Sequence, residues 1–448
     1  MMKRVRRSLL LCLFVTSCLF AQSKLVVGYY PSWNKASFPH TAIKYRNVTH
    51  IAHAFIFPTS DGGLDLAGFS HYPELISTAH LNGVGVVISV GGYDLVRTPR
   101  FGQVVKDTVA RRKFVAALKA FCINNGYDGA DLDWEYPKSE DRANAALLFR
   151  ELRAAFSDAL PPLSLSIAAP ATDWNNGYDW AVMKEVLDWV GVMTYDFYGS
   201  WLPTAGPNSP LYGSSSLSGW IDQSVSYYKA KGIPASKILI GTPFYGWQFN
   251  ASAMYGTSTA ASQIVYNSIV PFIQQGWIRQ WDATTRVPHI VNPTQTRVIS
   301  YDDAESIAGK MKYVRDQSLG GTIVWALGQD NVGGQQPLID AVALGLGLTT
   351  GVGMSETTEI PHDFRLDQNY PNPFNGQTQI QYAIAVPGDY SLRVIDLLGR
   401  QVALLEDRYH PAGSYRSAFS SAEVPSGIYL CRLSGNGGNL TRKIMVLR

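Results

Sequence analysis

Short apolar stretches alternate with helical stretches over residues 24–348. In Arg111–Asn125, the apolar residues Phe114, Leu118 and Phe121 recur at helical spacing, and Gly126 follows as a stop signal. Eight stretches rich in apolar residues predict buried strands: Leu25–Tyr30, His50–Phe57, Gly85–Val90, Gly129–Glu135, Leu163–Ala169, Trp189–Tyr195, Lys237–Pro243 and Thr322–Leu327. Eight strands with helices between them predict a (β/α)8 barrel of the α/β class. An open doubly wound sheet is disfavoured, because no glycine-rich phosphate loop follows the first strand.

The longest connection between predicted strands runs from Trp247 to Gly320. It carries two strand-like segments of its own, Val287–Val291 and Thr296–Tyr301. We therefore expect a small α+β insertion at about residues 248–303, within a barrel domain that covers residues 22–348.

The composition and residue pattern of the chain change after the predicted barrel. Residues 349–363 are small, polar and rich in glycine and threonine, which predicts a linker. Short alternating strands separated by turn signals then predict an antiparallel β-sandwich over residues 364–448. The predicted strands of this sandwich are Gln379–Ile384, Ser391–Asp396, Gln401–Leu405, Ile428–Leu433 and Arg442–Leu447.

The first 21 residues predict a signal peptide, with a basic head before the apolar run Leu9–Phe20 and the small residue Ala21. Val15–Cys18 resembles a lipoprotein cleavage box, so lipidation at Cys18 stays open. The formal net charge is +3, and removing the segment's four basic residues leaves 34 basic against 35 acidic residues, a net of −1. A nucleic acid partner is therefore not expected.

Two cysteines remain after the signal peptide, Cys122 and Cys431, and they lie in different predicted domains. No disulfide framework follows from them, and no cysteine and histidine residues have metal-ligand spacing. We expect a monomer without a metal or another cofactor.

The strongest chemical signal is the segment Asp128–Glu135. Side chains alternate along a strand, so Asp131, Asp133 and Glu135 share one face, with neighbours about 6–7 Å apart. No basic residue lies on this strand, and three buried acids so close must share protons, which is typical of active sites. Glu135 comes last, at the carboxyl end of the strand, where such barrels place catalysis.

These residues resemble glycoside hydrolase family 18. Asp128–Glu135 matches the family's DxxDxDxE signature, Ser89–Gly92 is similar to its SxGG motif, and Met193–Asp196 is similar to its MxYD motif. Trp325 stands on the eighth strand, where the family has a tryptophan floor. The resemblance covers residues 24–348 and implies a chitinase.

The resemblance also implies roles for single residues. Glu135 would protonate the glycosidic oxygen, and the substrate's own 2-acetamido oxygen would attack C1 in place of a carboxylate nucleophile. Asp133 would orient the acetamido N–H and share a proton with Asp131. Tyr195 would bond the acetamido carbonyl, and Asp196 would shape the site. The residues implied to line the substrate pocket are Tyr29, Phe55, Gly92, Trp134, Met193, Tyr245 and Trp325.

Several alternatives stay open at this point. Trp33, Tyr136, Tyr198 and Trp201 follow strand ends and are either sugar platforms or packing residues. The substrate is chitin or another glycan that contains N-acetylglucosamine, because an endo-β-N-acetylglucosaminidase shares the acidic signature. A chitin-binding lectin on the same barrel is less favoured, because such relatives usually have the acid replaced.

The C-terminal region has a resemblance of its own. Leu366–Asn375, Asp396–Arg400, Ser426–Tyr429 and Thr441–Lys443 together are similar to the sorting domain of the type IX secretion system. The resemblance implies cargo that crosses a bacterial outer membrane, so we expect the secretion machinery as a partner and a secreted or cell-surface location. A carbohydrate-binding sandwich is the alternative, but residues 364–448 contain no tryptophan.

Overall fold

The computed structural model describes residues 24–348 and 364–447, apart from residues 370, 387, 411–412, 422–423 and 437. The predicted signal peptide, Cys18 and the predicted linker lie outside the described residues. None of the helices in the described ranges combines the length and the hydropathy needed to span a lipid bilayer.

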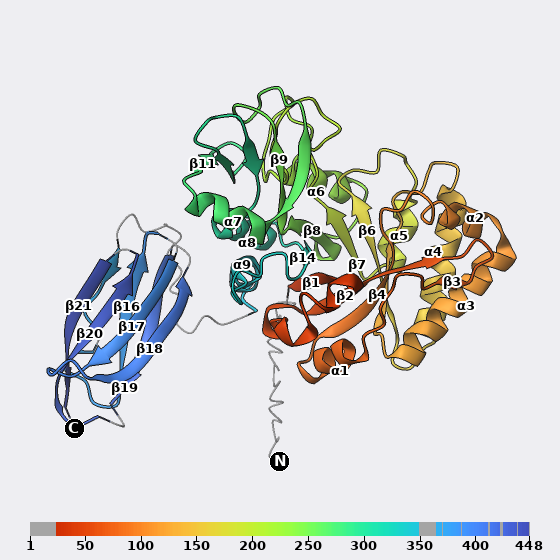
Figure 1. The fold of residues 1–448 in the computed structure, drawn as a ribbon. Coiled ribbons are helices and arrows are strands. Elements are labelled where there is room, and N and C mark those ends of the chain that lie inside the picture. Colours follow the sequence, from red (N-terminus) through yellow and green to blue (C-terminus); the bar gives the residue numbers. More distant parts are fainter. Residues whose placement is uncertain are drawn as a thin grey trace, which may run out of the picture.

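A closed sheet of eight parallel strands forms the centre of the first domain (Figure 1). Each strand pairs with its neighbours in parallel, and β1 pairs with both β2 and β14, which closes the barrel as predicted. The barrel strands are β1 (Leu25–Pro31), β2 (His50–Pro58), β4 (Gly85–Gly91), β5 (Gly129–Asp133), β6 (Ser164–Pro170), β7 (Trp189–Met193), β8 (Ile238–Pro243) and β14 (Gly321–Trp325). The two-residue strand β3 (Leu64–Asp65) pairs antiparallel with the end of β2.

Helices cover the outside of the barrel, and α3 illustrates why they form where they do. The Asp107 carboxylate accepts hydrogen bonds from the N–H groups of Val109 and Ala110, and Gly126 ends the helix with a left-handed φ of 75°. The helices around the barrel are α1 (Pro73–Leu81), α2 (Arg100–Lys106), α3 (Thr108–Asn125), α4 (Arg142–Ser157), α5 (Trp180–Val186), α6 (Ile221–Ala230), α8 (Ala304–Asp316) and α9 (Pro337–Gly345). Short 3₁₀ turns lie at Ser32–Lys35, His40–Ala42, Tyr45–Asn47 and Ala235–Lys237.

The barrel interior holds a separate apolar cluster. Aliphatic side chains such as Val27, Val87 and Leu239 fill part of it. Aromatic side chains complete the same cluster, among them Tyr29 and Trp325. The interior is therefore a packed core, with the functional residues expected at the carboxyl ends of the strands.

An α+β lobe is inserted between β8 and α8 (Figure 1). Its five-stranded antiparallel sheet has the order β10-β9-β13-β12-β11. The elements are β9 (Tyr245–Phe249), β10 (Ala261–Val265), α7 (Tyr266–Gln274), β11 (Ile278–Asp282), β12 (Val287–Val291) and β13 (Val298–Ser300). Because β9 begins at Tyr245, the lobe starts directly after the barrel strand β8.

The C-terminal domain consists of two antiparallel sheets, with the orders β15-β16-β19 and β18-β17-β20-β21, and a core of its own. The strands are β15 (Arg365–Leu366), β16 (Gln377–Ile384), β17 (Gly388–Ile395), β18 (Gln401–His410), β19 (Gly413–Ser420), β20 (Gly427–Gly435) and β21 (Gly438–Val446). The sequence did not predict β19, because the buried face of this strand includes the small polar residue Ser417. Cys122 and Cys431 are free thiols buried in the cores of the two different domains.

Three predicted ends of barrel strands were wrong by two residues, including that of β14, which ends at Trp325 and not at Leu327. β5 ends at Asp133 and β7 at Met193, so Glu135 and Tyr195 lie just beyond the ladders. The last bond between β4 and β5 runs from Gly92 N–H to the carbonyl of Asp133 at 2.7 Å. Glu135 and Tyr195 remain at the carboxyl end of the barrel.

Candidate active site

Asp131 lies deepest in the row of carboxylates on β5. Its Oδ2 accepts hydrogen bonds from the Tyr29 hydroxyl at 2.7 Å and the Ser89 hydroxyl at 3.0 Å. Its Oδ1 accepts from the Ser166 hydroxyl at 2.7 Å. Burial raises the pKa of Asp131, and these three hydroxyl groups partly offset that rise because they stabilise the charged form.

Asp133 lies one step nearer the mouth of the barrel and is fully buried. Among the described residues, no donor reaches its Oδ1. Burial raises the pKa of Asp133 well above its usual range, and the negative charges of Glu135 and Asp131 raise it further. The carboxyl group is therefore inclined to hold a proton while one oxygen stays available as an acceptor.

Glu135 follows at the mouth, and its carboxylate accepts a hydrogen bond from the Tyr136 hydroxyl. Burial raises the pKa of Glu135 to about 7, the hydrogen bond from Tyr136 lowers it, and the charge of Asp196 raises it. Tyr136 in turn packs edge-on against Trp174, with ring centroids 4.9 Å apart. A carboxyl group with this pKa can both give and take a proton near neutral pH.

Tyr195 and Asp196 come from the loop after β7. Trp247 Nε1 donates to Asp196 Oδ1 at 2.8 Å, and the Tyr245 hydroxyl donates to the same carboxylate. Tyr195 packs edge-on against Tyr245, with centroids 6.0 Å apart. Burial raises the pKa of Tyr195 far above its usual range, and so do the nearby carboxylates, so its hydroxyl stays a hydrogen-bond donor.

Aromatic rings form a floor beside the carboxylates. Trp325, at the end of β14, stacks on Phe55 with centroids 5.7 Å apart and an interplanar angle of 19°. Tyr29 meets the same indole edge-on at 5.7 Å. Met193 and these three aromatic residues belong to one apolar cluster inside the barrel, and Trp325 also packs on the cluster of the inserted lobe.

Glycines let the backbone and rings approach closely around the site. A Cβ on Gly91 would lie 2.1 Å from the carbonyl oxygen of Asp133, and one on Gly92 would lie 2.9 Å from the Phe55 ring. Both residues also have φ values near +100°, at 119° and 91°. Glycine is therefore required at both positions, because any side chain there would collide with these neighbours and strain the backbone.

Trp134 is placed differently from the expectation that it lines the pocket. Its buried indole stacks on Phe101 of α2 at 5.2 Å and belongs to the main core outside the barrel. The alternation of side chains on β5 continues just past its end at Asp133, so Trp134 points away from the barrel interior. Asp128 is also remote from the other carboxylates: it accepts from Val86 N–H and contacts His80 at the start of the strand.

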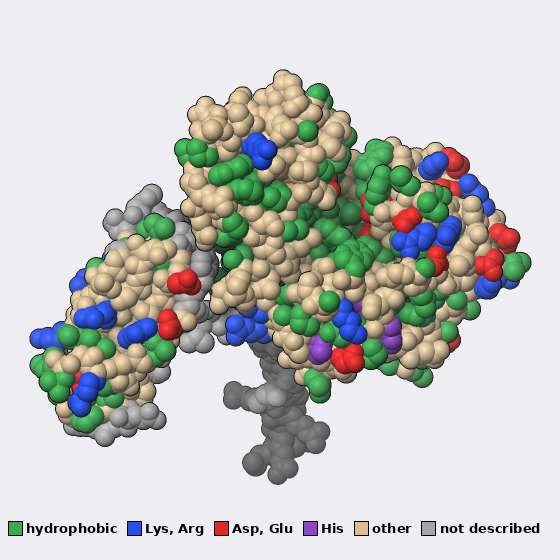
Figure 2. Space-filling model, in the orientation of Figure 1, with side chains coloured by type: hydrophobic (Ala, Val, Ile, Leu, Met, Phe, Trp, Pro, Cys, Tyr) green, Lys and Arg blue, Asp and Glu red, His purple; other side chains and the backbone are tan. Residues whose placement is uncertain are grey.

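Exposed aromatic side chains gather on the loops at the carboxyl end of the barrel. Trp33, Trp174 and Trp201 are each more than half exposed, whereas Tyr198 is buried in the cluster of the inserted lobe. Figure 2 shows that the surface is hollowed between this lobe and the rest of the barrel, with hydrophobic side chains in the hollow. Such a surface suits the apolar faces of sugar rings.

Sequence reasoning missed three residues that hold the site together. Ser166 donates to Asp131, Trp247 donates to Asp196, and Asn208 Oδ1 accepts from the N–H of Asp196 at 3.0 Å. Only Ser166 had a local signal, as a small polar residue on the inward face of an apolar strand. Among the described residues, no group of three histidine, cysteine or acidic side chains is arranged to hold a metal ion.

Two known families match this chain. The family described as "Glycosyl hydrolases family 18" matches residues 25–330. The family described as "Secretion system C-terminal sorting domain" matches residues 368–447. Together they account for both described domains.

Curated relatives and solved structures agree with the first match. A "Probable endochitinase" of Caenorhabditis elegans is 36% identical over 297 residues, which is 58% of this chain and 48% of that protein. "Chitinase A1" of Niallia circulans is 30% identical over 328 residues, or 61% of this chain and 46% of that protein. The chain thus spans about half the length of these two relatives. The crystal structure of an immunomodulatory active chitinase from Trichuris suis is similar with a TM-score of 0.67 and 28% identity, covering 72% of this chain and 100% of that one.

Proposed function

The chain belongs to family 18 of the glycosyl hydrolases, and we propose that it is a secreted chitinase that cleaves β-1,4 linkages between N-acetylglucosamine units. One observation carries the proposal. Asp131 and Asp133, both buried, and the half-buried Glu135 lie in a row, and among the described residues no lysine or arginine pairs with them. The middle acid, Asp133, keeps an unpartnered oxygen beside Glu135. Such an arrangement is costly for stability and useful for proton transfer.

The mechanism proposed for this site begins with Glu135 as general acid. Its pKa of about 7 leaves a large protonated fraction near neutral pH, so it can protonate the glycosidic oxygen of the leaving sugar. Once that proton has left, the carboxylate can take one from the attacking water in the second step. Asp196 supports the first step, because its negative charge raises the pKa of Glu135.

The nucleophile is proposed to come from the substrate. Most retaining glycosidases place a second carboxylate about 5–5.5 Å from the acid, on the opposite side of the anomeric carbon. Here Asp133 and Asp131 follow each other down the strand that leads to Glu135, so both approach from the acid's own side. The acetamido oxygen of N-acetylglucosamine can attack C1 instead and give an oxazolinium intermediate, an established exception to the two-carboxylate scheme.

Each neighbour has a proposed part in this attack. The free oxygen of Asp133 accepts the acetamido N–H, and Asp131 shares a proton with Asp133 while hydroxyl groups hold it in place. The Tyr195 hydroxyl donates to the acetamido carbonyl. Trp325 and Phe55 lie beneath the sugar ring as an apolar floor.

Matched oligosaccharides with and without the acetyl groups test the mechanism. We expect hydrolysis of N-acetylated chitin hexamer and none of chitosan hexamer or cellulose, with inhibition by a thiazoline analogue of the intermediate. Comparable rates on the acetylated and deacetylated oligomers would overturn the substrate-assisted mechanism. Release of intact N-glycans from a glycoprotein without cleavage of chitin hexamer would replace the chitinase by an endo-β-N-acetylglucosaminidase.

The C-terminal domain is proposed to direct export through a type IX secretion system, which would leave the enzyme secreted or on the cell surface. The support is the match of residues 368–447 to a secretion sorting domain, together with a hydrophobic core separate from that of the barrel. A chain that ends at Leu348 should keep its activity on soluble oligosaccharides and accumulate in the periplasm of the native host. Loss of activity on truncation would show instead that the domain is part of the enzyme.

A further inference from the structure

A completely buried ion pair is connected by hydrogen bonds to the loop that carries Tyr195 and Asp196. Lys310 of α8 and Asp302, which precedes that helix, have side chains that are 0% and 1% exposed, and Lys310 Nζ lies 2.6 Å from Asp302 Oδ1. The Ser306 hydroxyl donates to the same carboxylate at 2.7 Å. Removing two charges from water costs about as much as their attraction returns, so stability alone is a weak reason for this pair.

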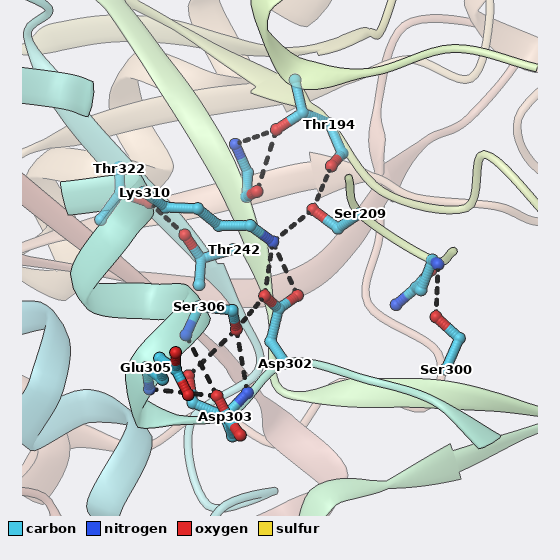
Figure 3. Close-up of polar contacts among 12 residues, drawn as sticks. Thr194, Ser209, Thr242, Ser300, Asp302, Asp303, Glu305, Ser306, Lys310 and Thr322 are labelled. Atoms are coloured by element: carbon cyan, nitrogen blue, oxygen red, sulfur yellow. Dashed lines mark hydrogen bonds and ion pairs between the residues drawn. The ribbon is translucent and has the colours of Figure 1, made fainter. Parts of the chain in front are cut away.

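The pair is connected to the loop that carries Tyr195. Lys310 Nζ donates to the Ser209 hydroxyl at 2.8 Å, and that hydroxyl donates to the carbonyl oxygen of Thr194 at 2.7 Å (Figure 3). The side chain of Thr194 is held as well. Its hydroxyl donates to the carbonyl of Gly241 at 2.9 Å and accepts from the N–H of Gly241 at 2.8 Å. The carbonyl held by Ser209 belongs to the peptide unit that leads directly into Tyr195.

The residue next to Ser209 holds the other half of the same loop. Asn208 Oδ1 accepts from Asp196 N–H, and Asn208 Nδ2 donates to the carbonyl of Tyr245 at 3.0 Å. Asp196 has a left-handed φ of 58°, a conformation that a residue with a side chain keeps only when its surroundings fix it. The segment Asn208–Ser209 therefore clamps the loop from Thr194 to Asp196 against α8 and the inserted lobe.

We propose that Ser209, held by the Lys310–Asp302 ion pair, is a positioning residue that sets the orientation of Tyr195 and Asp196. This inference rests on the function proposed above for those two residues. An acetamido group must be held in a near-attack geometry, and a displacement of about 1 Å can cost 10²-fold in rate. Loss of the Ser209 hydroxyl should therefore lower kcat more than it raises KM.

Two serine variants separate positioning from general stability. Ser209 and Ser306 each form a hydrogen bond with the ion pair through their hydroxyl groups. Only the Ser209 hydroxyl also donates to the carbonyl of Thr194. We expect Ser209→Ala to lower kcat about tenfold, which corresponds to about 1.4 kcal/mol in the barrier, with KM changed less than about twofold. Ser306→Ala should lower the melting temperature and leave kcat as in the wild type.

The pH profile gives a readout that lost stability does not move. The charge of Asp196 raises the pKa of Glu135, so a displaced Asp196 lets that pKa fall. The alkaline limb of kcat/KM should then move to lower pH in Ser209→Ala and stay in place in Ser306→Ala. Wild-type kcat and an unmoved limb in Ser209→Ala would overturn the inference.

A crystal structure of Ser209→Ala keeps the test independent of the proposed function. We expect the Thr194–Tyr195 peptide to rotate and the Tyr195 ring to shift relative to the wild type. An unchanged loop overturns the inference even if the enzyme is active. A wild-type protein that does not hydrolyse N-acetylated oligomers, but whose loop shifts in Ser209→Ala, refutes the proposed function and leaves the positioning role in place.

Discussion

Two groups of buried acids differ in one respect, the presence of a cation. The first group consists of the neighbouring acids Asp131, Asp133 and Glu135. Within the described residues, no lysine or arginine forms an ion pair with them. Asp302 is as buried as Asp131 and Asp133 but contacts Lys310 on both oxygens. Burial raises the pKa of all four acids, and only at Asp302 does a positive charge oppose that rise. The first group therefore retains protons that can be transferred. The second group is an ion pair without net charge, and through Ser209 it holds the backbone carbonyl of Thr194.

The largest effect should follow from removing the acid at the mouth of the barrel. Glu135→Gln keeps the size of the side chain but cannot transfer a proton, so kcat should fall by about 10⁴-fold, the upper end of general acid catalysis. Binding of chitin hexamer, measured by calorimetry, should persist. Glu140→Gln, in the exposed segment just beyond, is the matched control and should keep full activity. Substantial residual turnover in Glu135→Gln would assign the proton to another group.

The second group should respond mainly in stability, with a smaller fall in kcat because Lys310 holds Ser209. Asp302→Asn leaves the ammonium group of Lys310 buried without its counter-charge, and breaking such a pair costs about 3–5 kcal/mol. Adding Lys310→Met removes the stranded charge, so the double variant should recover most of that loss. Urea denaturation measures both. A double variant no more stable than Asp302→Asn would mean that the pair matters for more than its charges.

The sequence predicted the first group far better than the second. The carboxylates of β5 follow from the alternation of one strand, which is local, and the same alternation places Trp134 in the outer core against the assignment drawn from the family. Lys310 lies 101 residues from Ser209 along the chain, and Ser209 lies 15 residues from Thr194. Only the packing of α8 on the barrel brings the three residues together. Periodicity carries no information about such contacts.

Asp133→Asn should have the next largest effect within the first group. The amide cannot share a proton with Asp131, and it adds N–H donors where the proposed mechanism needs an acceptor, so we expect a fall in kcat of about 10²-fold. The pH profile should also change shape, because one of the interacting acids is lost. A profile that keeps the shape of the wild type at reduced height would argue against proton sharing.

A smaller effect concerns the charge that acts on Glu135 from outside its strand. Glu135 must be protonated to act as an acid, so kcat/KM should fall as pH rises through about 7. The negative charge of Asp196 raises that pKa, and Asp196→Asn removes the charge, so the alkaline limb should move to lower pH. A limb that moves to higher pH would show that hydrogen bonds of Asp196, rather than its charge, act on Glu135.

The smallest effect should come from the acid of the same signature that lies outside both groups. Asp128 stands at the start of β5, where its side chain is 42% exposed, contacts His80 at 2.8 Å and accepts from Val86 N–H. Asn can still accept that N–H, and an exposed ion pair contributes at most about 1 kcal/mol, so Asp128→Asn should cost no more than that in urea denaturation. Its kcat and pH profile should match the wild type, because the side chain is remote from the mouth of the barrel. If Asp128→Asn and Asp133→Asn instead lost activity equally, and only as far as each lost stability, the absence of a cation would not distinguish a catalytic acid from a structural one.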